Sequence, residues 1–142
     1  MTDTSGDAHP QPTLPSTFAY EGTLLERMGI ELTEVAAERT VGTMPVMGNT
    51  QPAGLLHGGA SVVLAETLGS IAANCHAGSG RIAVGIEINA SHHRSVREGT
   101  VTGVATPLAL TRSSASYEIV ITDQDGRRVC TSRLTCRLVE PR

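Results

Sequence analysis

The segment GLLHGGASVVLAETLGSIAANC, residues 54–75, decides the fold expected for this chain. From about residue 59 to residue 76 nearly every position is small or aliphatic, which predicts one long helix that is buried on most of its faces. A single carboxylate, Glu66, interrupts this apolar run. Burying an ionised carboxylate without partners costs several kcal/mol. We therefore expect a structural or chemical reason for Glu66.

Alternation of β-branched and polar residues predicts strands on both sides of this helix. The expected strands lie within residues 30–46 (two strands), 82–89, 100–110, 115–123 and 127–140. Residues 21–29 predict a short amphipathic helix closed by Gly29, and the Asp-Gly turn at 125–126 predicts a hairpin. Ile82, Val84, Ile86 and Ile88 are expected on one face of their strand.

These elements predict an α+β fold in which a curved antiparallel sheet of five or six strands wraps round one long central helix. Residues 1–17 predict a disordered tail, because they are rich in Pro, Ser, Thr and Asp, and residues 18–142 form the folded domain. Unpaired edge strands predict association into dimers.

Composition narrows the function classes. The net charge of −3 gives no indication of a nucleic-acid or membrane surface, and the tail lacks a signal peptide. Three cysteines without CxxC spacing are typical of reduced thiols in a cytoplasmic protein. All 11 basic residues are Arg, which excludes a Schiff-base lysine.

The HGG motif at residues 57–59 begins the long helix. Gly58 and Gly59 would expose backbone N–H groups at the positive helix end, where a carbonyl oxygen that gains negative charge can bind. The alternative is that the two glycines form only a tight entry turn.

Glu66 is the candidate catalytic group in the helix. Ser70, four residues later, lies on the same face and can offer a hydroxyl to the carboxylate or to a water. A buried ion pair with an arginine from a neighbouring strand is the structural alternative for Glu66.

The stretch NASHHRSVREG, residues 89–99, contains two adjacent histidines. In a strand His92 and His93 point to opposite faces, and no Cys or carboxylate stands at ligand spacing, so we expect no metal site. One histidine can line a cleft while Arg94 or Arg97 meets a phosphate, or the stretch is a solvated strand end.

Three segments together resemble the hotdog-fold acyl-CoA thioesterases. They are QPAGLLHGGASVVLAETLGS, VGIEINASHHRSVREGTVTG and DQDGRRVCTSRLT, and the likeness extends from about residue 28 to residue 138. The branch contains the 4-hydroxybenzoyl-CoA thioesterase of the Arthrobacter type, 1,4-dihydroxy-2-naphthoyl-CoA thioesterase and the proofreading thioesterase of enterobactin synthesis. Related phenylacetate-pathway enzymes usually carry Asp where this chain has Glu66.

The resemblance implies a role for each motif residue. Glu66 matches the catalytic carboxylate, nucleophile or general base, and Gly58 matches the N–H donor that polarises the thioester carbonyl. Gln51 and His57 match residues that hold the substrate carbonyl or the attacking group, and Ser70 matches a hydroxyl that positions water. His92 matches a residue that contacts the acyl group in close relatives. Further residues expected to contact substrate are His93, Arg94, Gly59 and Thr67, of which Arg94 is suggested by its charge and not by the resemblance.

The resemblance also implies a reaction: hydrolysis of an aromatic acyl thioester of coenzyme A, with no metal and no organic cofactor. It implies homodimers that pair into homotetramers, with active sites across the dimer interface. The alternatives are a proofreading thioesterase acting on acyl carrier proteins, a hotdog hydratase, and a non-catalytic module that binds or senses acyl-CoA.

Overall fold

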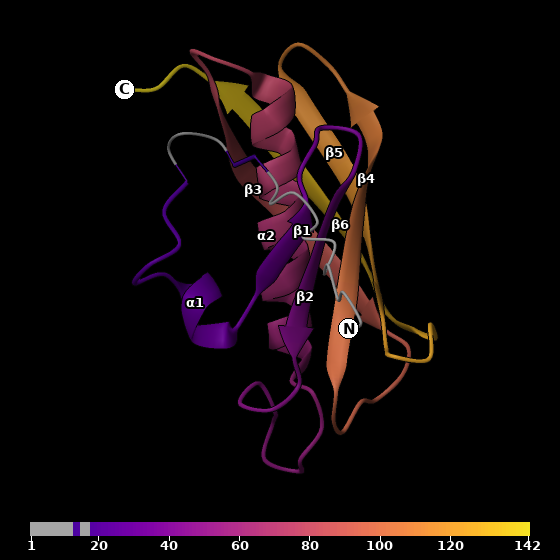
Figure 1. Cartoon of the computed structure of the whole chain (residues 1–142). Helices are drawn as coiled ribbons and strands as arrows, with labels where there is room; N and C mark the ends of the chain where they lie inside the picture. Colours follow the sequence, from indigo (N-terminus) through magenta and orange to yellow (C-terminus); the bar gives the residue numbers. More distant parts are fainter. Residues whose placement is uncertain (1–12, 15–17) are drawn as a thin grey trace, which may run out of the picture.

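The apolar segment predicted to be the long helix forms one, α2, over Gly58–Ala77. In this computed structural model, which describes residues 13–14 and 18–142, a curved sheet packs against one side of α2 (Figure 1). The predicted tail, residues 1–17, lies outside the described residues except for 13 and 14. That tail and its boundary therefore stay predictions.

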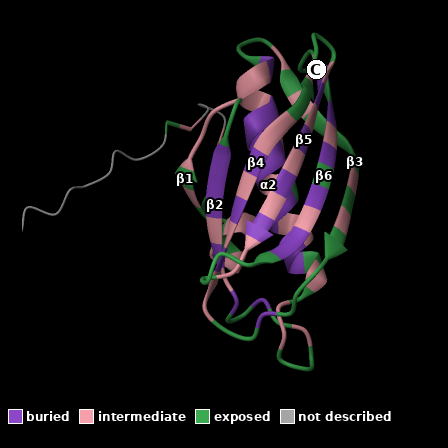
Figure 2. Ribbon diagram, turned by 90° about the vertical axis from the view of Figure 1, so that its right-hand side faces the viewer, coloured by how far each residue is buried: buried purple, intermediate pink, exposed green. Residues whose placement is uncertain are grey.

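Six strands make the sheet, and every neighbouring pair is antiparallel. The strands are β1 (Glu31–Glu34), β2 (Thr40–Pro45), β3 (Ile82–His92), β4 (Thr100–Leu110), β5 (Ser114–Thr122) and β6 (Arg128–Val139). Their order across the sheet is β1-β2-β4-β5-β6-β3, so β3 forms an edge (Figure 2). The predicted α+β fold, with one helix inserted after the second strand, is confirmed.

Glycines let α2 approach the sheet closely. A Cβ on Gly42 of β2 or on Gly103 of β4 would come within 2.7 Å and 2.6 Å of the Leu68 side chain. Leu68 itself is fully buried, together with Leu64 and Ala65 of the same helix. Missing side chains on the strands therefore make room for a leucine row on the helix, which builds the core.

Edge strand β3 departs from the simple alternation expected of it. A bulge between Gly85 and Glu87 shifts its pairing with β6. Ile88 consequently packs against the core, whereas Ile82, Val84 and Ile86 are exposed. The expectation that Ile88 shares their face is wrong.

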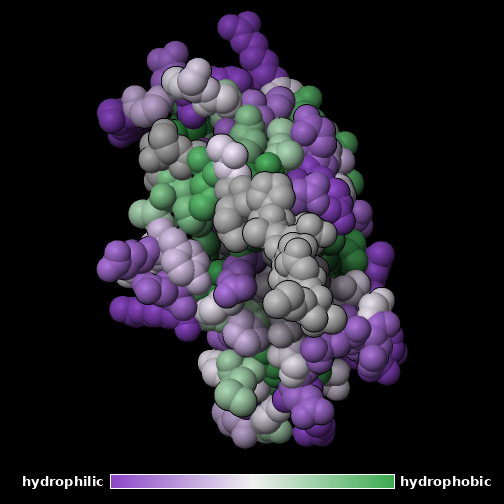
Figure 3. Space-filling view, in the orientation of Figure 1, coloured by the Kyte–Doolittle hydropathy of each residue, from purple (hydrophilic) through white to green (hydrophobic). Residues whose placement is uncertain are grey.

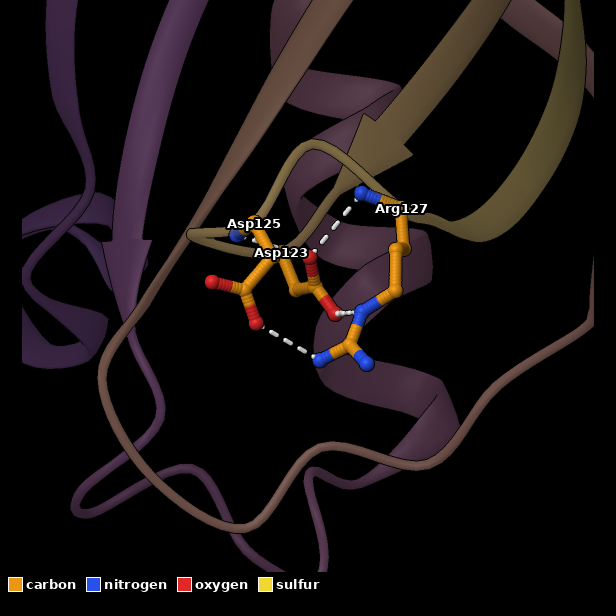
Figure 4. Close-up of polar contacts among 3 residues, drawn as sticks. All are labelled: Asp123, Asp125 and Arg127. Atoms are coloured by element: carbon orange, nitrogen blue, oxygen red, sulfur yellow. Dashed lines mark hydrogen bonds and ion pairs between the residues drawn. The ribbon is translucent and has the colours of Figure 1, made fainter.

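The predicted hairpin joins β5 to β6 through a turn held by Asp123 (Figure 4). Its carboxylate accepts the backbone N–H groups of Asp125 and Arg127, at 3.0 Å and 2.9 Å. The Arg127 guanidinium pairs with both aspartates. These contacts hold the pKa of Asp123 below its usual value, the Arg127 backbone N–H contributing most.

The predicted short helix is α1 (Leu24–Met28), and Gly29 ends it in the left-handed conformation that a C-cap needs. Across the described residues, every helix is too short or too polar to span a bilayer.

Candidate active site

His57 caps the first turn of α2. Its Nδ1 accepts the Gly59 N–H at 2.8 Å. A neutral imidazole that accepts through Nδ1 carries its proton on Nε2. The expectation of two free glycine amides is therefore corrected, because the Gly59 N–H is used inside the turn.

The other glycine amide of the motif, the N–H of Gly58, is not used in this way. Gly58 is the first residue of α2, so its N–H has no partner within the helix, and none of the described residues accepts a hydrogen bond from it. A Cβ at this position would lie 2.9 Å from His92 Nε2. The bare glycine therefore lets the His92 ring lie directly against the start of the helix.

A pocket of about 390 Å³ opens at this end of α2. Its lining comes from the loop before α2, the first turn of α2, the end of β3 and the start of β6. The lining residues are Gln51, Leu55, Leu56, Gly58, Ser61, His92, His93, Arg94, Ser95 and Val129.

Gln51 is one of the residues that line this pocket. Its side-chain oxygen accepts the Ala53 N–H, which folds the loop into a tight turn. The Gln51 NH₂ group is therefore the end of the side chain with hydrogen bonds still to donate.

His93 and Arg94 line the pocket, and Arg128 directly precedes the lining residue Val129. Arg128 donates to Thr131 Oγ1 at 3.2 Å, and His93 Nε2 lies 2.9 Å from the same oxygen. Arg94 is exposed, and within the described part of the chain no carboxylate forms an ion pair with Arg94 or Arg128. These charges suit a phosphate-bearing ligand.

Both adjacent histidines line this one pocket. They were expected on opposite faces of a strand, but β3 ends at His92 and alternation stops there. No group of three or more His, Cys, Asp or Glu side chains suited to a metal ion occurs among the described residues.

Glu66 is exposed in the single chain, which corrects the expectation of a carboxylate enclosed by apolar residues. The described residues contain no ion pair to it. The structural alternative, a pair with a strand arginine, is therefore not what the structure shows. Glu66 lies outside the pocket and faces Gly85 of β3.

Ser70 and Thr67 are half-buried on α2, near Glu66. Ser70 also lies near Cys136 of β6, a fully buried thiol. Burial raises the pKa of Cys136, the Glu66 charge raises it further, and a hydrogen bond from Ser70 opposes the rise. Glu66, Ser70 and Cys136 therefore form one neighbourhood between α2 and the β3 side of the sheet.

Within one chain, the two groups that acyl transfer would use lie far apart. Gly58 and Glu66 stand eight residues apart on α2, which is about 12 Å along the axis at 1.5 Å per residue. A thioester carbonyl spans far less than that distance. The N–H of Gly58 and the carboxylate of Glu66 in the same chain therefore cannot both reach one carbonyl group.

Several pocket residues were not expected from the sequence. Leu56 donates its N–H to the Val96 oxygen at 2.7 Å, which brings the loop before α2 against the segment after β3. Val129 accepts the His93 N–H at 2.7 Å. These contacts join segments far apart in the chain, and no local spacing indicates them.

This chain is similar to known proteins in sequence and in fold. The family model described as "Thioesterase superfamily" matches residues 53–130. The proofreading thioesterase EntH of Cronobacter turicensis is 56% identical to this chain, over 80% of this chain and 84% of its own length. The proofreading thioesterase EntH of Cronobacter sakazakii is 52% identical, over 83% of this chain and 87% of its own length. A crystal structure of a Haemophilus influenzae thioesterase is 40% identical over 84% of this chain and 85% of its own, with a TM-score of 0.81.

Proposed function

We propose that this chain hydrolyses aromatic acyl thioesters of coenzyme A. The chain belongs to the thioesterase superfamily and is a thioester hydrolase. The observation that carries the assignment of the site is the unused N–H of Gly58 in a pocket with a free amide donor, Gln51. The preference for an aromatic acyl group rests on the motif resemblance and on Glu66, where related phenylacetate-pathway enzymes usually carry Asp.

In the proposed reaction the thioester oxygen accepts the Gly58 N–H, with the positive end of α2 behind it. Glu66 attacks the carbonyl carbon, or takes a proton from a water that Ser70 holds and that attacks instead. The C–S bond breaks and the thiolate leaves with the bonding electrons, so no strong general acid is needed. If Glu66 attacks, water hydrolyses the resulting anhydride.

Two chains must build each site, because Gly58 and Glu66 of one chain are too far apart. Strand β3 offers a free edge and three exposed apolar side chains, Ile82, Val84 and Ile86. Figure 3 shows a hydrophobic (green) area on the side of the molecule where Figure 1 draws α2. We propose a homodimer paired along β3, and pairing of dimers into a tetramer.

The test is turnover of benzoyl-CoA by Glu66→Ala, followed by thiol release. We expect kcat to fall by roughly a thousandfold or more, as for other groups that act directly on the reacting carbonyl. Glu66→Gln is the matched control, since it keeps the side chain's size without its charge, and it should be equally slow. If either variant keeps near wild-type kcat, the mechanism is wrong.

A second candidate substrate is an acyl group on a carrier protein. It is favoured by the two relatives named proofreading thioesterases. Coenzyme A and carrier proteins share the pantetheine arm, so kcat/KM for one acyl group on both carriers decides between them. Arg94→Ala should raise KM in either case, because the phosphate lies on the shared arm.

The proposed location is cytoplasmic, which the three free thiols favour. The proposed hydrolysis uses no cofactor beyond the substrate's own coenzyme A. The non-catalytic sensing module is set aside, because the chain is a thioester hydrolase. A hydratase is set aside for the same reason.

A further inference from the structure

Gly85 of β3 lies directly against the Glu66 carboxylate. A Cβ built on Gly85 would lie 3.4 Å from Glu66 Oε1 and 3.6 Å from Leu134 Cδ1. These are ordinary contact distances, so a methyl group fits there without a clash. Any longer side chain at this position would extend over the carboxylate or displace it.

The backbone does not require glycine at this position. Gly85 is not among the described glycines with positive φ, so an L-residue can adopt its conformation. Packing does not require glycine either: the Cβ distances at Gly42, Gly69 and Gly103 fall to 2.6–2.7 Å, whereas those at Gly85 do not fall below 3.4 Å.

Glycine within a strand is normally a disadvantage, since it raises the entropy of the unfolded chain and offers no side chain for packing. A chain with alanine at position 85 should therefore fold at least as well as the chain with Gly85. Neither the backbone conformation nor packing against the core accounts for this glycine.

The missing side chain of Gly85 leaves the Glu66 carboxylate accessible. Glu66 is the only exposed residue of α2 between positions 60 and 77. The bulge that follows Gly85 turns the edge strand just where it passes the carboxylate. A missing side chain and a bulge thus coincide at the point where β3 would otherwise cover Glu66.

We propose that Gly85 is a specificity-determining residue, which keeps the Glu66 carboxylate open and leaves room for the bulk of the acyl group beside it. The inference rests on the proposed function, because it concerns the approach of the same thioester to the same carboxylate. Gly85 touches the space that the acyl group enters and takes no part in bond making.

The test compares Gly85→Ala and Gly85→Val across thioesters of increasing acyl size. We expect kcat/KM for benzoyl-CoA to fall roughly tenfold in Gly85→Ala and roughly a hundredfold in Gly85→Val, because the added bulk takes up room that the acyl group needs and shifts the thioester from its reactive position. Acetyl-CoA should lose less. The melting temperature of Gly85→Ala should equal or exceed that of the wild type. Asn89→Val is the matched control, because it adds a branched side chain to the same strand on the opposite face and should leave the acyl preference unchanged.

A second readout does not depend on turnover. Labelling of Glu66 by a water-soluble carbodiimide and an amine, mapped by mass spectrometry, should be slower in both Gly85 variants than in the wild type. Wild-type labelling rates and acyl preference in a folded Gly85→Ala overturn the inference, as does a wild-type Glu66 that is not labelled. If Gly85→Val fails to fold, Gly85→Ala decides alone.

The two proposals fail differently. An active Glu66→Ala overturns the proposed mechanism. An inactive Glu66→Ala, together with Gly85 variants that hydrolyse every thioester as the wild type does, overturns only the role of Gly85.

Discussion

At the first turn of α2, the two glycine amides of the HGG motif differ. The His57 ring accepts the Gly59 N–H, whereas the Gly58 N–H has no acceptor among the described residues. The HGG motif predicts glycine amides at the start of α2, but the spacing of its residues does not say which amide is free. That answer depends on a side-chain rotamer, which only the folded turn sets.

The capping role of His57 leads to a prediction about stability. His57→Ala should lower the free energy of unfolding by about 1 kcal/mol, because the Gly59 N–H loses its acceptor. His57→Asn should recover most of that loss, since asparagine is a good N-cap. Urea denaturation of the three proteins measures it. Equal stability of the alanine variant and the wild type would contradict a capping role.

Glu66 shows a different limit of sequence analysis. Its apolar neighbours in the chain predict burial, and most of them are indeed buried. Its own exposure depends on Gly85, which lies nineteen positions later and reaches it only through the fold. A single helical segment cannot indicate what the strand beyond it leaves uncovered.

At the scale of elements, local pattern predicts the helices and strands well. Alternation and turn residues place all six strands, and Gly29 places the end of α1. The bulge in β3 was not predicted, because it is a change of register in the pairing of β3 with β6. Register is a property of two strands together.

The β5–β6 hairpin carries a pH-dependent contribution through Asp123. Its lowered pKa means that the carboxylate stabilises the fold above the pKa of the unfolded state, about 4, and that this contribution is lost as the pH falls through the folded pKa. Asp123→Asn should therefore be less stable than the wild type at pH 7, and the difference should shrink toward pH 2. Urea midpoints of both proteins at the two pH values measure it; a difference that grows on acidification would contradict the assignment.

At the scale of the whole molecule, the sequence motifs were sufficient to indicate the hotdog thioesterase family, and the relatives and solved structures confirm it. The lining of the pocket at the start of α2 could not be predicted from the sequence. Leu56 and Val129 enter it through contacts between segments far apart in the chain.

The exposed edge of β3 gives a prediction about assembly. Val84→Lys places a charge on this edge, which disfavours strand pairing, and should convert the dimer to an inactive monomer. Leu108→Lys is the control, because Leu108 is also exposed and apolar but belongs to β4, away from that edge. Light scattering after size exclusion gives both masses. A dimeric Val84→Lys would place the interface elsewhere.

A complementation assay tests directly whether two chains build each active site. One chain carries Glu66→Ala and the other Gly58→Pro, which removes the N–H at a helix position that tolerates proline. Gly58→Ala controls for the added Cβ, which meets His92.

The variants are co-expressed with different tags, and particles containing both are purified and assayed with benzoyl-CoA. We predict inactive parents and a mixed dimer with about half of the wild-type kcat, since one of its two sites is intact. A mixed dimer as inactive as its parents would show that Gly58 and Glu66 do not act on one thioester from different chains.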